Sequence, residues 1–249
     1  MISPDPTSAP DVVIRARGLL KQYGTTTALA GVDLDIPRGR SLAIMGASGS
    51  GKTTLLHCLA GIVVPDAGSV RLAGSDGSTA DVAAMNDPQR TELRRTRFGF
   101  VFQQTMLIPE LTAIENVALP AMLGGRPRLA AMHSAAEWLG ALGLAGMEGR
   151  RIGELSGGQA QRVAIARAQI LRADVVFADE PTGALDSVTS ADTMQALIGS
   201  TTGDGRTLVV VTHDARVAAA CDLVVRMHDA RIVDAFVPDA APVETAVAR

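Results

Sequence analysis

Short apolar runs recur along the chain and predict the strands of an α/β protein. They are rich in β-branched residues and are bounded by polar or glycine-containing segments. The runs cover residues 12–14, 42–45, 98–102, 175–178 and 208–212. The last two are apolar without alternation, which is typical of strands that are covered on both faces by helices.

A hairpin is predicted near the end of the chain, where segments 223–227 and 231–234 flank Asp229 and Ala230. This two-residue turn lacks the glycine that a type I′ turn favours, so its type stays open.

The stretch 105–151 has a different character, with Ala/Leu/Met-rich segments at helical spacing over 113–122 and 129–142 and no strand pattern. We therefore expect a helical subdomain, over about 105–160, inserted into the α/β core. Trp138, the only tryptophan, is interpreted as a packing residue within it.

The two ends, residues 1–11 and 238–249, are rich in proline and alanine, and we interpret them as tails around one domain over 12–237. The first segment lacks the apolar stretch of a signal peptide. No apolar run approaches the ~18–20 residues of a membrane-spanning helix. These features predict a cytoplasmic chain that reaches a membrane only through a partner.

The net charge and the cysteine content of the chain further limit its binding partners and its cellular compartment. The formal net charge of −3 argues against a surface that binds nucleic acid or anionic lipid non-specifically. Cys58 and Cys221 are the only cysteines, and we interpret both as small core residues in a reducing compartment. A disulfide between them is the less favoured alternative.

One glycine-rich stretch has the pattern of a complete phosphate-binding loop. It reads Gly46-Ala47-Ser48-Gly49-Ser50-Gly51-Lys52-Thr53. Its glycines allow backbone N–H groups to surround a polyphosphate, Lys52 supplies a charge to the β- and γ-phosphates, and the Thr53 hydroxyl can bind Mg²⁺. A helix predicted after the loop directs its positive end at the anion. A chance match is the alternative, but the chain has only two lysines, Lys21 and Lys52, which makes it rare.

A second candidate for anion binding is the segment from Ser156 to Gln159, which precedes a strongly helical run. Ser156 is a favourable N-cap, and Gly157 and Gly158 leave the start of the helix open to a close anion. A turn that merely caps a helix explains the same residues, and the segment alone does not separate the two.

Carboxylates follow the apolar run at 175–178. Asp179 at a strand end near the phosphate loop would reach Mg²⁺, and Glu180 would orient or polarise an attacking water. A solvated acidic pair before a proline turn is the alternative. His213 and Gln103 also follow apolar runs, and the carboxyl ends of parallel strands are where ligands bind.

Together these segments resemble the ATP-binding subunit of an ABC (ATP-binding cassette) transporter, from about residue 12 to 237. Residues 46–53 are similar to its Walker A loop, 155–159 to its LSGGQ signature, 175–180 to Walker B and 184–186 to the D-loop. The resemblance implies an α/β P-loop NTPase fold of the ABC ATPase type. That fold has a mostly parallel core sheet, an N-terminal antiparallel β subdomain and an inserted helical subdomain.

The resemblance also assigns site residues. It implies that Glu180 and the switch histidine His213 are catalytic, and that Thr53, the Q-loop residue Gln103 and Asp179 hold Mg²⁺. ATP would contact Tyr23, which would stack on adenine, and the loop residues Gly46, Ala47, Ser48, Gly49, Ser50, Gly51, Lys52, Thr53 and Thr54. A second cassette, expected to be identical, would contribute Ser156, Gly157, Gly158, Gln159 and Asp186 in trans.

The implied function is ATP hydrolysis at a dimer interface that drives a separate integral membrane permease, with the chain held at the cytoplasmic face of the membrane. Residues 99–103, 111–117 and 178–187 resemble the branch that serves macrolide export, lipoprotein release and antimicrobial-peptide resistance. Export or extrusion is therefore the leading hypothesis. A force-transmitting ATPase that regulates a cell-wall or signalling protein without cargo stays open. A cassette protein of DNA repair or translation is disfavoured, because the chain has one cassette and no coiled-coil insertion.

Overall fold

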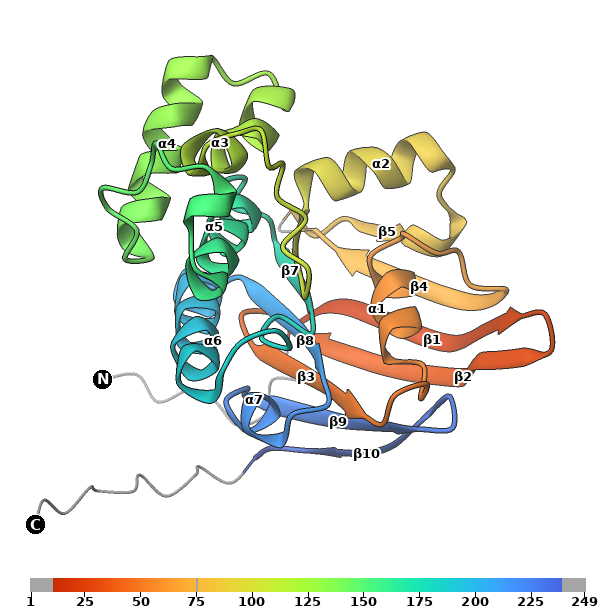
Figure 1. Ribbon diagram of the computed structural model, residues 1–249. Coiled ribbons are helices and arrows are strands. Elements are labelled where there is room, and N and C mark those ends of the chain that lie inside the picture. Colours follow the sequence, from red (N-terminus) through yellow and green to blue (C-terminus); the bar gives the residue numbers. More distant parts are fainter. Residues whose placement is uncertain (1–10, 75, 239–249) are drawn as a thin grey trace, which may run out of the picture.

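The computed structural model describes residues 11–74 and 76–238, and its centre is a six-stranded sheet in the order β10-β9-β3-β8-β7-β6 (Figure 1). All neighbouring strands are parallel except β10, which is antiparallel to β9. The strands are β3 (Ser41–Gly46), β6 (Phe98–Phe102), β7 (Val175–Asp179), β8 (Thr207–Thr212), β9 (Leu223–His228) and β10 (Arg231–Phe236). The mostly parallel core sheet is thereby confirmed.

Strands β7 and β8 are buried on both faces, as their apolar sequences predict. Along β8, Leu208 and Val210 belong to one hydrophobic cluster, whereas Val209 and Val211 belong to a second cluster on the other face. Alternate side chains of a strand point to opposite faces, so a strand between two cores needs apolar residues at every position.

The second sheet is antiparallel, with four strands in the order β2-β1-β4-β5. Its strands are β1 (Val12–Tyr23), β2 (Thr26–Pro37), β4 (Ala67–Ala73) and β5 (Thr79–Asp81). It packs over helix α1 (Lys52–Leu59), whose residues Leu55, Leu56 and Leu59 join apolar residues of both sheets in one cluster.

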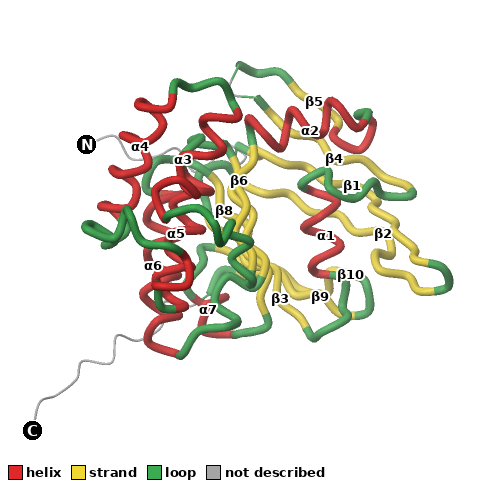
Figure 2. Tube along the Cα trace, turned by 45° about the horizontal axis from the view of Figure 1, so that its top comes forward, coloured by secondary structure: helices red, strands yellow, loops and turns green. Residues whose placement is uncertain are grey.

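Helices cover the opposite face of the core sheet (Figure 2). They are α3 (Ala113–Leu123), α4 (Arg128–Ala141), α5 (Gly157–Gln169), α6 (Ser187–Thr202) and α7 (Ala215–Ala219), and α2 (Asp87–Thr96) lies beside β6. Short 3₁₀ turns occupy Val82–Ala84 and Ile152–Glu154. None of the described helices is long and apolar enough to cross a membrane.

The predicted helical segment contains α3 and α4, which pack on each other and on α5. Thr112 begins α3 through a capping box with Glu115, and Pro120 lies inside that helix. Trp138 of α4 packs at the edge of the core, with the Arg206 guanidinium 5.8 Å from its ring centroid. The packing role of Trp138 is confirmed.

The closing hairpin joins β9 to β10 through Asp229 and Ala230, whose φ angles are 46° and 63°. Two consecutive left-handed residues are the signature of a type I′ turn, here without glycine.

Of the predicted tails, 1–11 and 238–249, only Asp11 and Pro238 belong to the described residues. Asp11 forms an ion pair with Arg38 at 2.8 Å.

Both cysteines are free and buried. Burial raises the pKa of the Cys58 thiol to about 11 and that of Cys221 to about 12. Because the thiolate is the reactive form, at pH 8 about one Cys58 in a thousand would be reactive even if it were accessible. We expect neither thiol to react with iodoacetamide in the folded protein at pH 8, and both to react in urea. Rapid labelling of the folded chain would contradict their placement in the core.

Candidate functional site

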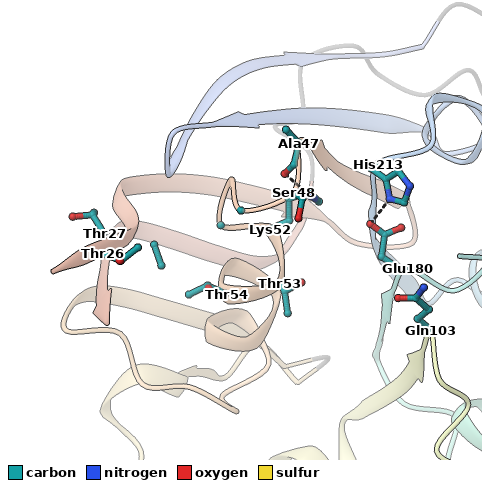
Figure 3. Close-up of a pocket in the computed structure, with 13 residues that line it drawn as sticks. Thr26, Thr27, Ala47, Ser48, Lys52, Thr53, Thr54, Gln103, Glu180 and His213 are labelled. Atoms are coloured by element: carbon teal, nitrogen blue, oxygen red, sulfur yellow. Dashed lines mark hydrogen bonds and ion pairs between the residues drawn. The ribbon is translucent and has the colours of Figure 1, made fainter. Parts of the chain in front are cut away.

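The predicted site residues at the ends of β3, β6, β7 and β8 meet at one end of the core sheet, because the carboxyl ends of its parallel strands lie there. The phosphate loop follows β3, Glu180 follows β7, His213 follows β8 and Gln103 follows β6. They surround a cavity of about 650 Å³ (Figure 3), within the range of small-molecule sites. It is lined by Thr26, Thr27, Ala28, Ala47, Ser48, Gly49, Gly51, Lys52, Thr53, Thr54, Gln103, Glu180 and His213.

The phosphate loop encloses the Lys52 side chain. Its Nζ donates to the carbonyl oxygens of Gly46 at 2.8 Å and Ala47 at 2.9 Å, and the residue is only 7% exposed. Helix α1 begins at Lys52, and Gly51 before it provides no side-chain cap. The first N–H groups of this helix are therefore free to bind an anion, which the positive end of the helix favours.

Two loop glycines are required by close backbone packing. A Cβ on Gly51 would lie 2.2 Å from the carbonyl oxygen of Ala28, and one on Gly46 would lie 2.4 Å from that of Met227. Gly51 has a φ of 98°. Gly49 also has a left-handed φ, of 81°, but its Cβ would meet nothing within 4 Å.

These glycines form a matched pair for a stability test. We expect Gly51→Ala to lower the free energy of unfolding by about 2–4 kcal/mol, since strain in φ adds to a backbone clash. Gly49→Ala should lower it by about 1–2 kcal/mol from the left-handed conformation alone. Urea unfolding of both variants measures the difference, and equal losses would contradict the close approach to Ala28.

The three residues predicted to bind Mg²⁺ are Thr53, Gln103 and Asp179. All three line a neighbouring cavity of about 300 Å³. Thr53 Oγ1 donates to Asp179 Oδ1 at 3.3 Å. Burial raises the pKa of Asp179. Hydroxyl, carboxylate and amide oxygens are the hard ligands that Mg²⁺ prefers, so the donor set fits this ion.

Glu180 and His213 both line the main cavity and form a pair. His213 Nδ1 lies 2.8 Å from Glu180 Oε1. Glu180 has a φ of 47°, and its N–H donates to the carbonyl oxygen of Val211 at 2.9 Å. A left-handed glutamate is strained, and such strain is found where a side chain must be aimed. Here the turn directs the Glu180 carboxylate into the cavity.

The start of β2 contributes lining residues that the sequence analysis missed. Thr26, Thr27 and Ala28 line the cavity, whereas Tyr23 is not among its lining residues. Tyr23 ends β1 and is 51% exposed, with Lys21 Nζ 5.6 Å from its ring centroid. Its stacking on adenine stays a prediction. In the sequence, Gly24 directly after Tyr23 indicates a turn. This turn is the signal from which the return of β2 toward the phosphate loop could have been predicted.

The residues predicted to act in trans lie at two other helix starts, and none of them lines the cavity of their own chain. Ser156 caps α5, with Oγ accepting from Gln159 N at 3.3 Å and Gln159 Oε1 accepting from Ser156 N at 2.9 Å. Asp186 caps α6 and accepts from the N–H groups of Val188 and Thr189. The N-cap prediction for Ser156 is confirmed, and the action of these residues in trans stays a prediction.

Comparison with known proteins is consistent with this geometry. A model of the ABC transporter family matches residues 29–183. The lipoprotein-releasing system ATP-binding protein LolD of Porphyromonas gingivalis is 38% identical over 218 residues, which cover 88% of this chain and 97% of the relative. The macrolide export ATP-binding/permease protein MacB of Nitrosomonas europaea is 45% identical over 237 residues, 93% of this chain. This chain covers only 35% of that MacB protein, about a third of its length.

Among solved structures, the ATP-binding cassette MJ0796 is similar over almost its whole length. Its dimeric post-hydrolysis state, bound to ADP and Pi, matches with a TM-score of 0.80 at 36% identity. The match covers 91% of this chain and 99% of that one.

Proposed function

The chain belongs to the ABC transporter family of ATP-binding cassettes, and from this premise we propose that it hydrolyses ATP between two copies to drive a membrane permease. The family assignment and its activity as an ATPase agree with the resemblance drawn from the sequence. The observation that carries the proposal is the cavity in which the phosphate loop faces the paired Glu180 and His213.

In the proposed site the phosphates lie on the open N-terminus of α1, and the Lys52 ammonium exchanges its loop carbonyls for phosphate oxygens. Glu180 orients the attacking water and accepts its proton, and His213 holds the carboxylate through the 2.8 Å contact. Bound Mg²⁺, held by Thr53, Gln103 and Asp179, would neutralise the charge that develops on the phosphates.

Two copies in head-to-tail arrangement would complete the site. The start of α5, with Gly157 and Gly158 after the capping Ser156, would face the γ-phosphate bound to the other copy. The dimeric state of MJ0796 supports the pairing.

We place the pair at the cytoplasmic face of the membrane, on a permease that exports or extrudes its cargo. The printed functions of LolD and MacB, lipoprotein release and macrolide export, support this class. The permease would dock where the helical subdomain meets the region of Gln103. ATP would close the dimer through its higher affinity for the closed state, and hydrolysis would reopen it.

The partner is tested by trapping Glu180→Gln with ATP in membranes of the host and identifying what co-purifies. We expect a membrane protein with few spans and a large extracytoplasmic domain. Lys52→Ala, which should not bind ATP well, serves as the control and should recover less of it. Recovery of ribosomes, DNA or soluble proteins alone would contradict the transporter function and leave the ATP site intact.

A further inference from the structure

The two helix starts that are predicted to act in trans lie against each other within one chain. Helix α5 begins directly after Ser156, and α6 begins directly after Asp186 (Figure 1). The two helices pack on each other. At their starts, Gly158 of α5 lies against Thr189 of α6. Thr189 is therefore in contact with one of the trans segments while it belongs to the helix that follows the other.

Gly158 has no room for a side chain, because the methyl group of Thr189 occupies the space. A Cβ added to Gly158 would lie 2.3 Å from Thr189 Cγ2, whereas Thr189 Cβ would be 3.8 Å away, an ordinary van der Waals contact. A Cβ on the neighbouring Gly157 would meet only Leu185 Cδ2, at 3.6 Å. Among the described residues outside the start of α5, the Thr189 methyl group alone excludes a side chain at position 158.

The hydroxyl group of Thr189 holds the Asp186 carboxylate. Thr189 Oγ1 donates to Asp186 Oδ2 at 2.7 Å. Asp186 Oδ1 accepts from the N–H groups of Thr189 at 3.0 Å and Val188 at 3.1 Å. The N–H and hydroxyl groups of Thr189 favour the charged carboxylate and lower the pKa of Asp186. Thr189 thus provides two of these three bonds and fixes the direction of an exposed carboxylate.

We propose that Thr189 is a positioning residue for the ATP site of the other copy. Its methyl group packs α6 on Gly158, and its hydroxyl group orients Asp186. The start of α5 and the Asp186 carboxylate therefore reach the second copy in one fixed arrangement. A misplacement of about 1 Å in groups that orient a reacting centre can lower a rate about 10²-fold, so this arrangement matters to hydrolysis. The inference rests on the proposed action of these residues in trans.

A paired substitution tests the methyl contact. Gly158→Ala should lower phosphate release about tenfold or more, because α5 and α6 must separate to admit the new Cβ. Adding Thr189→Ser removes the methyl group and keeps the hydroxyl, so it should restore most of the lost activity. Gly157→Ala is the matched control, because its Cβ does not meet Thr189, and Thr189→Ser should not raise its activity. Failure of Thr189→Ser to improve the Gly158→Ala chain would overturn the contact as a positioning device.

Thr189→Val tests the hydroxyl group, because valine keeps the branched shape and cannot bind Asp186. Its effect in trans is measured in mixed dimers of two variants, Lys52→Ala and Gly157→Asp, each expected to be inactive alone. The working site of such a dimer joins Lys52 of the Gly157→Asp chain to the α5 start of the Lys52→Ala chain. Thr189→Val on the Lys52→Ala chain acts on this site, whereas on the Gly157→Asp chain it acts on the defective one.

We expect phosphate release by the equal mixture to fall about tenfold when the Lys52→Ala chain carries Thr189→Val, since a hydrogen bond to a charged group is lost. It should not change when the Gly157→Asp chain carries the same substitution. Each mixed dimer contains one valine in both cases, so a general effect on folding or pairing would lower both mixtures alike. The difference between the two mixtures therefore measures positioning at the working site.

The contrary outcomes are distinct. Equal losses in the two mixtures, or no loss in either, overturn the positioning role of Thr189 and leave the shared site in place. A loss only when the Gly157→Asp chain carries valine overturns it as well, because Thr189 would then act on the site of its own copy. If the mixture with Thr189 intact is no more active than its components, the shared site and this inference fail together.

Discussion

Replacing Glu180 by glutamine is expected to lower ATP hydrolysis by about 10²–10⁴-fold, the usual effect of removing a general base. Glutamine has nearly the same size, and its amide can still contact His213, but it cannot accept a proton from water. ATP should still bind, because within the described residues the hydrogen bonds of Glu180 join it to Val211, Gly183 and His213 and not to the phosphate loop. The variant should therefore accumulate as an ATP-bound dimer.

Phosphate release and size-exclusion chromatography measure the two effects on the same sample. Asp214→Asn is a control near His213, because Asp214 caps α7 and pairs with exposed Arg216, and it lines no part of the ATP cavity. It should keep most of the activity. A Glu180→Gln chain that stays monomeric with saturating ATP and Mg²⁺ would contradict the account of closure.

Replacing Lys52 by alanine is expected to weaken ATP binding about 10- to 150-fold, since hydrogen bonds to charged groups contribute about 1.5–3 kcal/mol. Hydrolysis should fall further, by at least about 10²-fold, because negative charge develops on the phosphates in the transition state. The Gly46 and Ala47 carbonyls hold the ammonium at the cavity. Lys52 is the only basic residue of the loop, residues 46–53, so no other side chain of the loop can replace its charge.

Binding of a fluorescent ATP analogue measures the affinity, and phosphate release measures the rate. Arg15→Ala is the matched control, because it removes a cation whose side chain is 53% exposed and whose partner Asp35 lies 3.4 Å away. Such exposed pairs contribute little, and ATP binding should not change. A Lys52→Ala chain with unaltered affinity would contradict the placement of the phosphates.

The sequence predicts the core strands well because burial on both faces requires continuous apolar residues. It predicts the phosphate loop because the glycines, Lys52 and Thr53 of the pattern each have a separate chemical role in binding phosphate or Mg²⁺. The sequence does not predict the type I′ turn, since Asp229 and Ala230 adopt left-handed conformations that these residue types do not favour. Here the pairing of β9 with β10 overrides local preference.

Elements with mixed polarity were harder to predict. The strand β1 has a half-exposed, irregular pattern interrupted by several register shifts against β2, so only its first residues stand out. In α6 two buried positions are threonines, Thr193 and Thr201, and Thr201 accepts from Gln169 of α5 at 2.7 Å. A helix that buries hydroxyl groups lacks the apolar stripe on which sequence analysis depends.

At the site, sequence analysis predicts residues whose chemistry is distinctive and misses those that contribute shape. Thr26, Thr27 and Ala28 line the cavity only because β2 returns to the loop, where Gly51 packs on Ala28. Such surfaces are set by packing between distant segments and leave no local pattern.

The most direct test of a shared ATP site mixes two inactive variants. Lys52→Ala loses its own phosphate site but keeps the start of α5. Gly157→Asp keeps Lys52 but directs a carboxylate at the γ-phosphate of the other copy. Its added Cβ meets only Leu185 Cδ2, at 3.6 Å, so the variant should fold.

Each mixed dimer contains one intact site, and about half of the dimers in an equal mixture are mixed. With independent sites, we predict that phosphate release, nearly absent in either variant alone, recovers to about a quarter of the unaltered activity on mixing. A mixture no more active than its components, although mixed dimers form, would contradict a site completed by the second copy.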